Sequence, residues 1–116
     1  MTTTPDTRIP DVPVPPGARP GAEGWAFWDD AFRVLHGEDR TIAGTGEREG
    51  DTIAEVGTTC CQFPDGSLDL VECPPAVHVN TFTDNGITSA QARQLAAELI
   101  EAAEEVDGWV RSQPRG

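Results

Sequence analysis

A repeat of apolar residues near the C-terminal end of the chain constrains its fold more than any other feature. The apolar positions recur every three or four residues, as they do on the buried face of an α-helix. Thr88 and Gln91 fit a capping box at the start of this segment, and Gly108 is placed to end it. The sequence therefore predicts an amphipathic helix over residues 88–107, with its glutamates in solvent. The apolar stripe consists of Ala92, Leu95, Ala96, Leu99, Ile100, Ala103 and Val106.

Two segments that precede the helix have the composition of β-strands. Residues 52–63 and 76–82 are rich in Val, Ile, Thr and other residues that suit a pleated sheet. In the second segment Val77 and Val79 alternate with polar residues, so both would lie on one face. We therefore expect both segments to be strands of one small sheet.

The segment 63–67, with the sequence Phe-Pro-Asp-Gly-Ser, contains the residues of a three-residue hairpin loop. Proline presets the backbone for the first loop position, and glycine accepts the left-handed conformation that closes the loop. In the resulting antiparallel register Cys60 faces Leu70, and Cys73 lies three positions away from Cys60. We therefore expect a hairpin whose second strand ends at Pro74.

The aromatic segment 25–35 admits two interpretations, a helix or a strand. In the strand interpretation, residues 31–35 turn at 36–39 and pair with residues 40–43. The glycine within the turn favours this strand interpretation. The helical interpretation rests on the three- to four-residue spacing of Trp25, Trp28, Phe32 and Leu35.

The first 24 residues contain six of the ten prolines in the chain. Proline donates no backbone hydrogen bond and favours the extended polyproline II conformation. The P-x-x-P spacing in this segment also occurs in peptides that bind aromatic grooves. We therefore predict a disordered Pro/Gly-rich arm over residues 1–24, a single domain over residues 25–110 and a frayed tail over residues 111–116.

These elements define the expected fold class. A chain of 116 residues has room for one domain, and a small core of this size leaves a modest stability margin. The order of strands followed by one helix is typical of an α+β fold. We predict a small antiparallel β-sheet of three to five strands with the C-terminal amphipathic α-helix packed on one face.

The charge balance excludes several classes of partner. Asp and Glu number 20 against 8 basic residues, all of them arginine, for a formal net charge of −12. Such a surface repels nucleic acid and anionic membranes, so direct binding to either is not expected. No apolar run reaches the ~18 residues needed to span a bilayer, and the N-terminal residues lack the pattern of a secretory signal. We expect a cytoplasmic protein.

The cysteines are the most plausible reactive groups. Three of them, Cys60, Cys61 and Cys73, make an odd number, which argues against a disulfide framework. Together with His78 they could be counted as four zinc ligands. Adjacent strand residues point to opposite faces, however, so Cys60 and Cys61 could not readily share one metal. We expect buried thiols, with no catalytic residue, no metal and no cofactor.

One segment carries a resemblance to known proteins. The helix over residues 87–105, Ile-Thr-Ser-Ala-Gln-Ala-Arg-Gln-Leu-Ala-Ala-Glu-Leu-Ile-Glu-Ala-Ala-Glu-Glu, follows the Gln-Phe-Pro-Asp-Gly hairpin at 62–66. This combination resembles short uncharacterised proteins of mycobacteria, related actinobacteria and their phages, over roughly residues 52–107. The resemblance implies a β-hairpin followed by a C-terminal helix, and it implies no activity, because none is established for that group.

The first functional hypothesis is a non-enzymatic protein–protein interaction module, one form of which is a phage-encoded protein that acts on a host protein. An alternative is an acidic mimic of nucleic acid that occupies a DNA- or RNA-binding protein, and a third is a thiol-dependent enzyme or zinc protein. A homodimer is also open, since one helix covers only one face of a sheet. The candidate interaction surface combines large aromatic and acidic side chains, namely Trp25, Trp28, Glu98, Glu101, Glu105 and Trp109.

Overall fold

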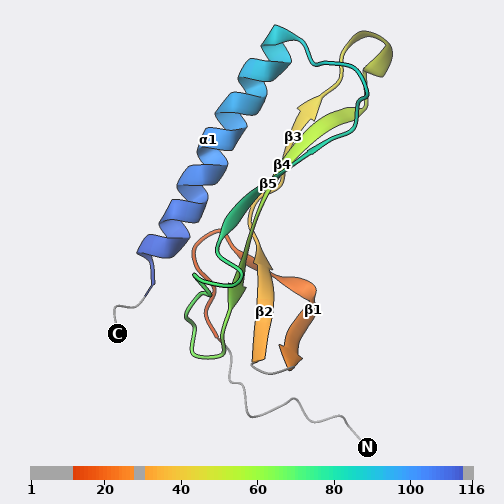
Figure 1. Ribbon diagram of the computed structural model, residues 1–116. Helices are drawn as coiled ribbons and strands as arrows, with labels where there is room; N and C mark the ends of the chain where they lie inside the picture. The colour runs from red at the N-terminus through yellow and green to blue at the C-terminus, as the bar shows by residue number, and fades with distance from the viewer. Residues whose placement is uncertain (1–11, 28–30, 114–116) are drawn as a thin grey trace, which may run out of the picture.

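The computed structural model describes residues 12–27 and 31–113, which form a five-stranded antiparallel sheet with one long helix across it (Figure 1). The prediction of an α+β fold, with a small antiparallel sheet and a C-terminal helix on one face, is confirmed. The elements in chain order are β1 (Arg19–Phe27), β2 (Ala31–His36), β3 (Arg40–Ala43), the short 3-10 helix η1 (Gly46–Arg48), β4 (Thr52–Gln62), β5 (Ala76–Thr81) and α1 (Ser89–Arg111).

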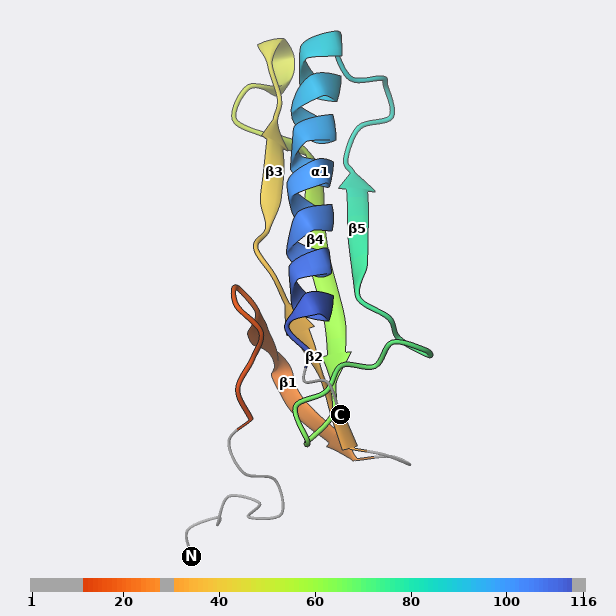
Figure 2. The same cartoon turned by 90° about the vertical axis from the view of Figure 1, so that its left-hand side faces the viewer.

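Strand β4 is the centre of the sheet and the longest strand in the described part of the chain. On one side, its two halves pair with β3 and β2, while β1 lies outside β2. On its other side β4 pairs with β5. Helix α1 lies along β4 with β3 on one flank and β5 on the other, as Figure 2 shows. The helix therefore covers β4 and the adjoining parts of β3 and β5.

Both strands of the strand interpretation, residues 31–35 and 40–43, are present, but the prediction that they pair with each other is wrong. Strands β2 and β3 follow one another along the same side of β4. Gly37, between the two strands, continues the pairing with β4, because its backbone N–H donates to the carbonyl of Thr58 at 3.0 Å. Glycine is needed here for close approach rather than for a turn, since a Cβ at this position would clash with the side chains of Thr58 and Glu105.

The predicted hairpin loop is confirmed in its details. The backbone N–H of Phe63 donates to the carbonyl of Ser67 at 2.8 Å, and Gly66 has a φ of +93°. Gln62 pairs with Leu68, as the register requires. The local turn residues were therefore sufficient to fix this loop.

The second strand of that hairpin, however, stops after Leu68, so the predicted pairing of Cys60 with Leu70 is wrong. The carboxylate of Asp69 accepts hydrogen bonds from the backbone N–H groups of Val71 and Glu72, at 2.9 and 3.0 Å. These bonds fold the chain into a turn. This local side-chain bond competes with the sheet ladder, which is why the strand ends early. Leu70 is exposed, and Cys73 is carried beside Cys61 instead of further along the strand.

Helix α1 begins as predicted and ends later than predicted. The capping box is present, with the Thr88 hydroxyl accepting from the N–H of Gln91 and the Gln91 side chain accepting from the N–H of Thr88. Gly108 does not end the helix, which continues to Arg111 and is capped at Ser112. Packing of the last turn against the sheet outweighs the cost of one glycine in a helix, about 1 kcal/mol.

The face that α1 buries is not the apolar stripe. The fully buried residues of the helix are Gln91, Ala102 and Trp109, each separated from the next by a multiple of the helical repeat. The prediction that the seven-residue stripe meets the sheet is therefore only partly right. Three of its members, Leu95, Leu99 and Val106, are half-buried at the edge of the buried face of the helix. The exposed members of the stripe are Ala92, Ala96, Ile100 and Ala103.

The fold begins before the predicted boundary at residue 25. Residues 12–18, which we call the proline strap, cross the lower end of the sheet, and β1 starts at Arg19. Carbonyl groups of the strap accept hydrogen bonds from three side chains of the domain, at 2.7 to 3.1 Å; the donors are Arg33, Gln62 and Trp109. Proline suits this role because its carbonyl remains a free acceptor. Residues 1–11 of the predicted arm and residues 114–116 of the predicted tail lie outside the described residues.

Two clusters of buried side chains lie between α1 and the sheet. The lower one joins Leu35, Cys60, Leu68 and Trp109, and the upper one joins Ile42, Ile53 and Ala54. Ile53 and Ala54 are both buried because the register between β3 and β4 shifts at this point. The ring of Trp109 is the largest fully buried side chain and links the strap, the helix and the sheet.

We expect Trp109→Ala to lower the free energy of unfolding by about 3–5 kcal/mol, because it leaves a large cavity in the lower cluster. Trp109→Phe retains a buried ring and loses the hydrogen bond to the Pro16 carbonyl, for a cost of about 1–2 kcal/mol. Urea denaturation followed by circular dichroism measures both. Val110→Ala is the control, since this neighbouring side chain is exposed; an equal loss in the control and in Trp109→Ala would contradict the assignment.

Candidate interaction surface

A single buried arginine lies between β3 and α1. The Arg40 side chain is 8% exposed, and carboxylates from one face of the helix lie 3.6 to 3.7 Å from its guanidinium nitrogens; they belong to Glu98, Glu101 and Glu105. A fourth carboxylate, that of Glu38, lies 3.8 Å away. These three helical positions follow the i, i+3, i+7 spacing of one face. Arg40 therefore draws an acidic face of α1 toward the sheet.

Glu105 is the most buried of these glutamates. Its side chain is 14% exposed, accepts a hydrogen bond from the Thr58 hydroxyl at 2.5 Å, and lies against the backbone of Gly37. Strand β4, strand β3 and the link between β2 and β3 thus hold one helical side chain. A buried charge is costly unless it is paired in this way, so alternative rotations of the helix are disfavoured.

The rotation that Arg40 selects leaves the apolar stripe on the opposite flank of the helix. Successive helical residues turn by about 100°, so Ala103 lies about a quarter of a turn away from the buried Ala102. The glutamates occupy the β3 side, and the stripe consequently lies on the β5 side. Ile100, in the middle of the stripe, is 61% exposed, and Val110, at its lower end, is 40% exposed.

Strand β5 adds to this apolar area. Val77 and Val79 lie opposite Thr58 and Val56 of β4, on the face that the helix covers. Val79 is nevertheless 45% exposed, because α1 lies over β4 and does not reach across β5. We call the exposed stripe and this strand together the α1–β5 surface, defined by Val77, Val79, Ala92, Ala96, Ile100, Ala103 and Val110.

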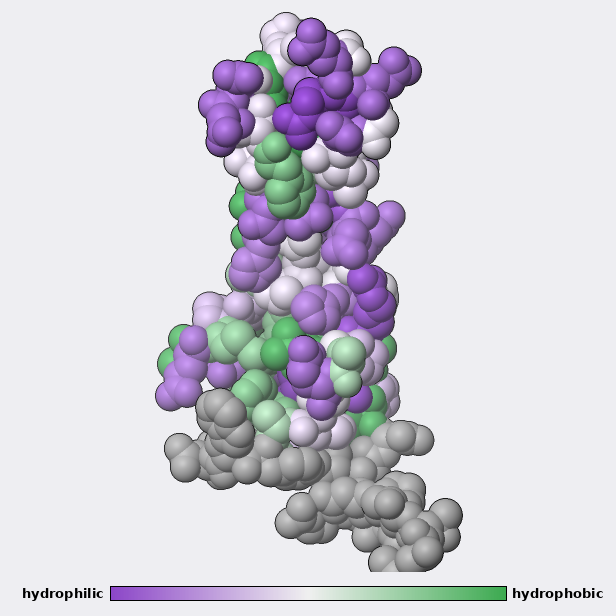
Figure 3. All heavy atoms as spheres, turned by 90° about the vertical axis from the view of Figure 1, so that its right-hand side faces the viewer, coloured by the Kyte–Doolittle hydropathy of each residue, from purple (hydrophilic) through white to green (hydrophobic). Residues whose placement is uncertain are grey.

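The other face of the sheet has a different character. At its centre, polar side chains of β4 and β5 pair with each other: Thr59 with His78 at 2.6 Å and Glu55 with Asn80 at 3.2 Å. Figure 3 shows this side, where hydrophilic residues dominate the upper half and hydrophobic ones gather lower down. An antiparallel sheet with such polar pairs can face water without a covering layer.

The residues predicted as an interaction surface are not brought together. Trp109 is buried at 1% exposure, so its inclusion in that surface is wrong: a helical residue with the spacing of Gln91 and Ala102 packs inward. Trp25 is half-buried, with the guanidinium of Arg33 4.6 Å from its ring centroid. Only part of the glutamate face is solvated, because Glu98 and Glu105 are largely buried beside Arg40 while Glu101 is 64% exposed. Trp28 lies outside the described residues.

The α1–β5 surface was missed because the stripe was taken as the buried face. One feature of the sequence indicates instead that an acidic face of the helix turns toward the sheet. Arg40 alternates with Ile42 on a short strand, so the two side chains share the covered face and the arginine requires carboxylates from the helix. Among the acidic residues of the helix, Glu98, Glu101 and Glu105 lie within about 60° of one another around its axis and so share a single face.

The thiols form a pair rather than a cluster. Cys60 packs in the lower cluster, while Cys61 points to the opposite face and lies beside the exposed Cys73. Burial raises the pKa of Cys60 and of Cys61 to about 12, and the neighbouring Cys73 adds to both shifts. Within residues 12–27 and 31–113, no three His, Cys, Asp or Glu side chains are grouped closely enough to hold a metal ion.

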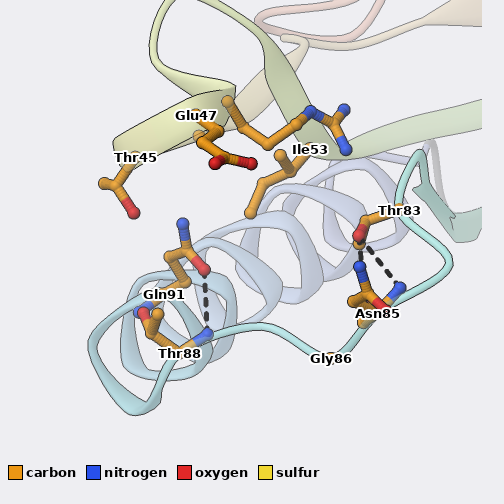
Figure 4. Close-up of a pocket in the computed structure, with 10 residues that line it drawn as sticks. Thr45, Glu47, Ile53, Thr83, Asn85, Gly86, Thr88 and Gln91 are labelled. Atoms are coloured by element: carbon orange, nitrogen blue, oxygen red, sulfur yellow. Dashed lines mark hydrogen bonds between the residues drawn. The ribbon is translucent and has the colours of Figure 1, made fainter.

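An open cleft of about 260 Å³ lies between the first turn of α1 and the loops at the upper end of the sheet. Figure 4 shows that its polar side chains already bond to neighbouring backbone groups: the Gln91 side chain accepts from the N–H of Thr88, and the Thr83 hydroxyl accepts from the N–H of Asn85 and donates to its carbonyl. The amide of Gln91 also donates to the carbonyl of Ala43 at 3.2 Å. These groups serve the fold, and the geometry assigns no chemistry to the cleft.

Comparisons of the chain with protein-family models, with curated proteins and with solved structures find no match. In the part of the chain that the structure describes, no helix has the length and apolar character needed to cross a membrane. Function is therefore inferred from the surfaces of the domain itself.

We expect Arg40→Ala to lower the free energy of unfolding by about 2–4 kcal/mol, since it leaves the glutamates of α1 without their cation. The loss is smaller than for a fully buried pair because Glu101 remains mostly in water. Urea denaturation measures it. Arg48→Ala removes an exposed pair with Asp51 and is the matched control, with an expected cost below about 1 kcal/mol. Equal costs for the two variants would contradict the role of Arg40.

We expect only Cys73 to react with iodoacetamide in the folded protein at neutral pH. Cys60 and Cys61 are buried, and their raised pKa leaves almost no thiolate, the reactive form. Raising the pH toward 9 should still leave Cys60 and Cys61 unlabelled. Mass spectrometry of intact and digested protein identifies the sites, and unfolding in urea should release all three. Labelling of Cys60 in the folded state would contradict its burial.

Proposed function

We propose that the protein is a non-enzymatic interaction module that binds a protein partner through the α1–β5 surface. The observation that carries the proposal is the exposure of Ile100 and of the stripe's alanines on the flank of α1 beside an edge strand. This surface exposes three larger apolar side chains, those of Ile100, Val79 and Val110, whereas the sheet-facing side of α1 is buried. Contiguous apolar areas of this kind mark interaction sites more often than scattered apolar residues do.

The free energy gained by burying these apolar side chains is large enough to contribute to binding. Burying a Val or Ile side chain completely contributes about 1.5–3 kcal/mol. The three exposed side chains are each about half in water, so covering them contributes roughly 2–4 kcal/mol before any hydrogen bond is counted. Interfaces commonly derive most of their affinity from a few central apolar side chains, and Ile100 has that position here.

The distribution of acid favours this proposal over a mimic of nucleic acid. A mimic needs carboxylates exposed in an extended array, whereas three glutamates of α1 are gathered around Arg40. The α1–β5 surface, in contrast, contains no charged residue among its defining members. An apolar protein surface suits it better than a basic one.

A cytoplasmic location and an actinobacterial or phage source belong to the same proposal. The free cysteines are in keeping with a reducing compartment. The source rests on the resemblance of the hairpin and helix to short actinobacterial and phage proteins, and it decides which lysate a binding experiment should use.

We expect a photo-reactive phenylalanine analogue at position 100 to crosslink to protein when the full chain is irradiated in an actinobacterial lysate. The same analogue at position 97 is the matched control, because Ala97 is exposed on the same helix but outside the stripe. Gel electrophoresis and mass spectrometry identify the adducts, including adducts between copies of this chain. Adducts at 100 that are absent at 97 support the proposal, and no protein adduct at 100 would overturn it.

A further inference from the structure

Strand β5 has one free edge. It pairs with β4 from Ala76 to Thr81, and no other described segment is hydrogen-bonded to its outer side. Edge strands usually carry a proline, a charged side chain or a bulge that prevents pairing with another chain. β5 has none of these: its sequence is Ala-Val-His-Val-Asn-Thr, and its register with β4 is unbroken. The strand is therefore competent to accept another strand.

The free edge and the exposed stripe face the same direction. Helix α1 runs antiparallel to β5 and beside it (Figure 2), and the stripe lies on the β5 flank of the helix. A strand added to β5 with a helix layer arranged as in this domain would place that helix on the same side of the sheet as α1, about three strand spacings or roughly 14 Å away. The valines of β5 lie between the two helices.

We infer that the occupant of this surface is a second copy of the chain, paired through antiparallel β5 strands across a two-fold axis. This inference rests on the proposed function and names the partner. A strand paired antiparallel with its own copy keeps the alternation of its side chains, so valines would meet beneath the helices and His78 and Asn80 would meet on the polar face. The two-fold axis also sets the apolar stripes of the two helices toward each other. The product is a continuous sheet with two helices on one face.

Charge supports a second copy at this place. Two chains with a formal net charge of −12 each repel one another over most of their surfaces. Strand β5 contains no Asp, Glu or Arg, and Glu98, Glu101 and Glu105 are turned toward β3, whereas Glu104 and Asp107 lie beside Ile100 on the outer side of α1. The edge of β5 is therefore where two such chains approach with least repulsion.

The available area fits a reversible dimer. β5 is about 20 Å long at ~3.3 Å per residue, and the stripe from Ala92 to Val110 is about 27 Å long at ~1.5 Å per residue. With a helix layer stacked about 10 Å above the strand, each copy presents on the order of 500 Å². A standard interface buries about 800 Å² per partner, so we expect dissociation at micromolar concentration.

Analytical ultracentrifugation of the full chain, from roughly 1 μM to about 500 μM, tests the inference. We expect the wild type to pass from a 12.4 kDa monomer to a dimer as the concentration rises. Ile100→Glu should weaken the dimer at least about tenfold by placing a charge in the interface. Ala97→Glu adds the same charge to the other flank of α1 and should dimerise like the wild type. Circular dichroism verifies that both variants are folded.

A wild type that stays monomeric throughout the range, or equal dimerisation of the Ile100→Glu and Ala97→Glu variants, would overturn the second copy as the occupant. The proposed function fails separately. If the wild type is monomeric while the photo-reactive residue at position 100 labels a different protein, the surface binds that protein and only the dimer is rejected. If position 100 labels neither a second copy nor another protein, both are rejected.

Discussion

The guanidinium group of Arg40 lies beneath α1, within 4 Å of three carboxylates on one face of the helix. Two of those carboxylates are largely withdrawn from water, and Glu105 is also bonded to Thr58 at the centre of the sheet. Because an unpaired charge in this position would be costly, the helix adopts the rotation that keeps the pairs together. Hydrophobic burial favours the same side of the helix, because Leu95, Val106 and Trp109 pack in or against the buried clusters. The pairs with Arg40 fix the rotation that leaves the other stripe residues exposed.

The remaining features of the domain follow from this arrangement. With the glutamates toward β3, the helix places Trp109 over the lower end of the sheet, where its indole N–H reaches the proline strap. The same rotation sets Ile100 and Ala103 outward on the side of β5. The pairing of Arg40 with the helix therefore accounts both for the packing of Trp109 in the core and for which apolar residues of α1 remain exposed.

The sequence was sufficient where a few neighbouring residues decide the structure. The hairpin loop at 63–67 and the capping box at Thr88 depend on backbone bonds between residues close in the chain, and both are as predicted. The pairing partners of β2 and β3 and the rotation of α1 depend on contacts between residues far apart. Thr58 with Glu105 and Arg40 with Glu98 are such contacts, and no local pattern encodes them. The candidate surface was missed for this reason.

The central claim is that α1 buries the face of Ala102 and exposes that of Ala103. Paramagnetic relaxation of alanine methyl groups by a soluble agent measures this directly, residue by residue, in the Ile100→Glu variant, where no second copy should shield the stripe. The account predicts strong relaxation of the methyl groups of Ala96 and Ala103 and weak relaxation of that of Ala102. Protection of Ala103 together with exposure of Ala102 would show that the stripe faces the sheet, and it would contradict the account.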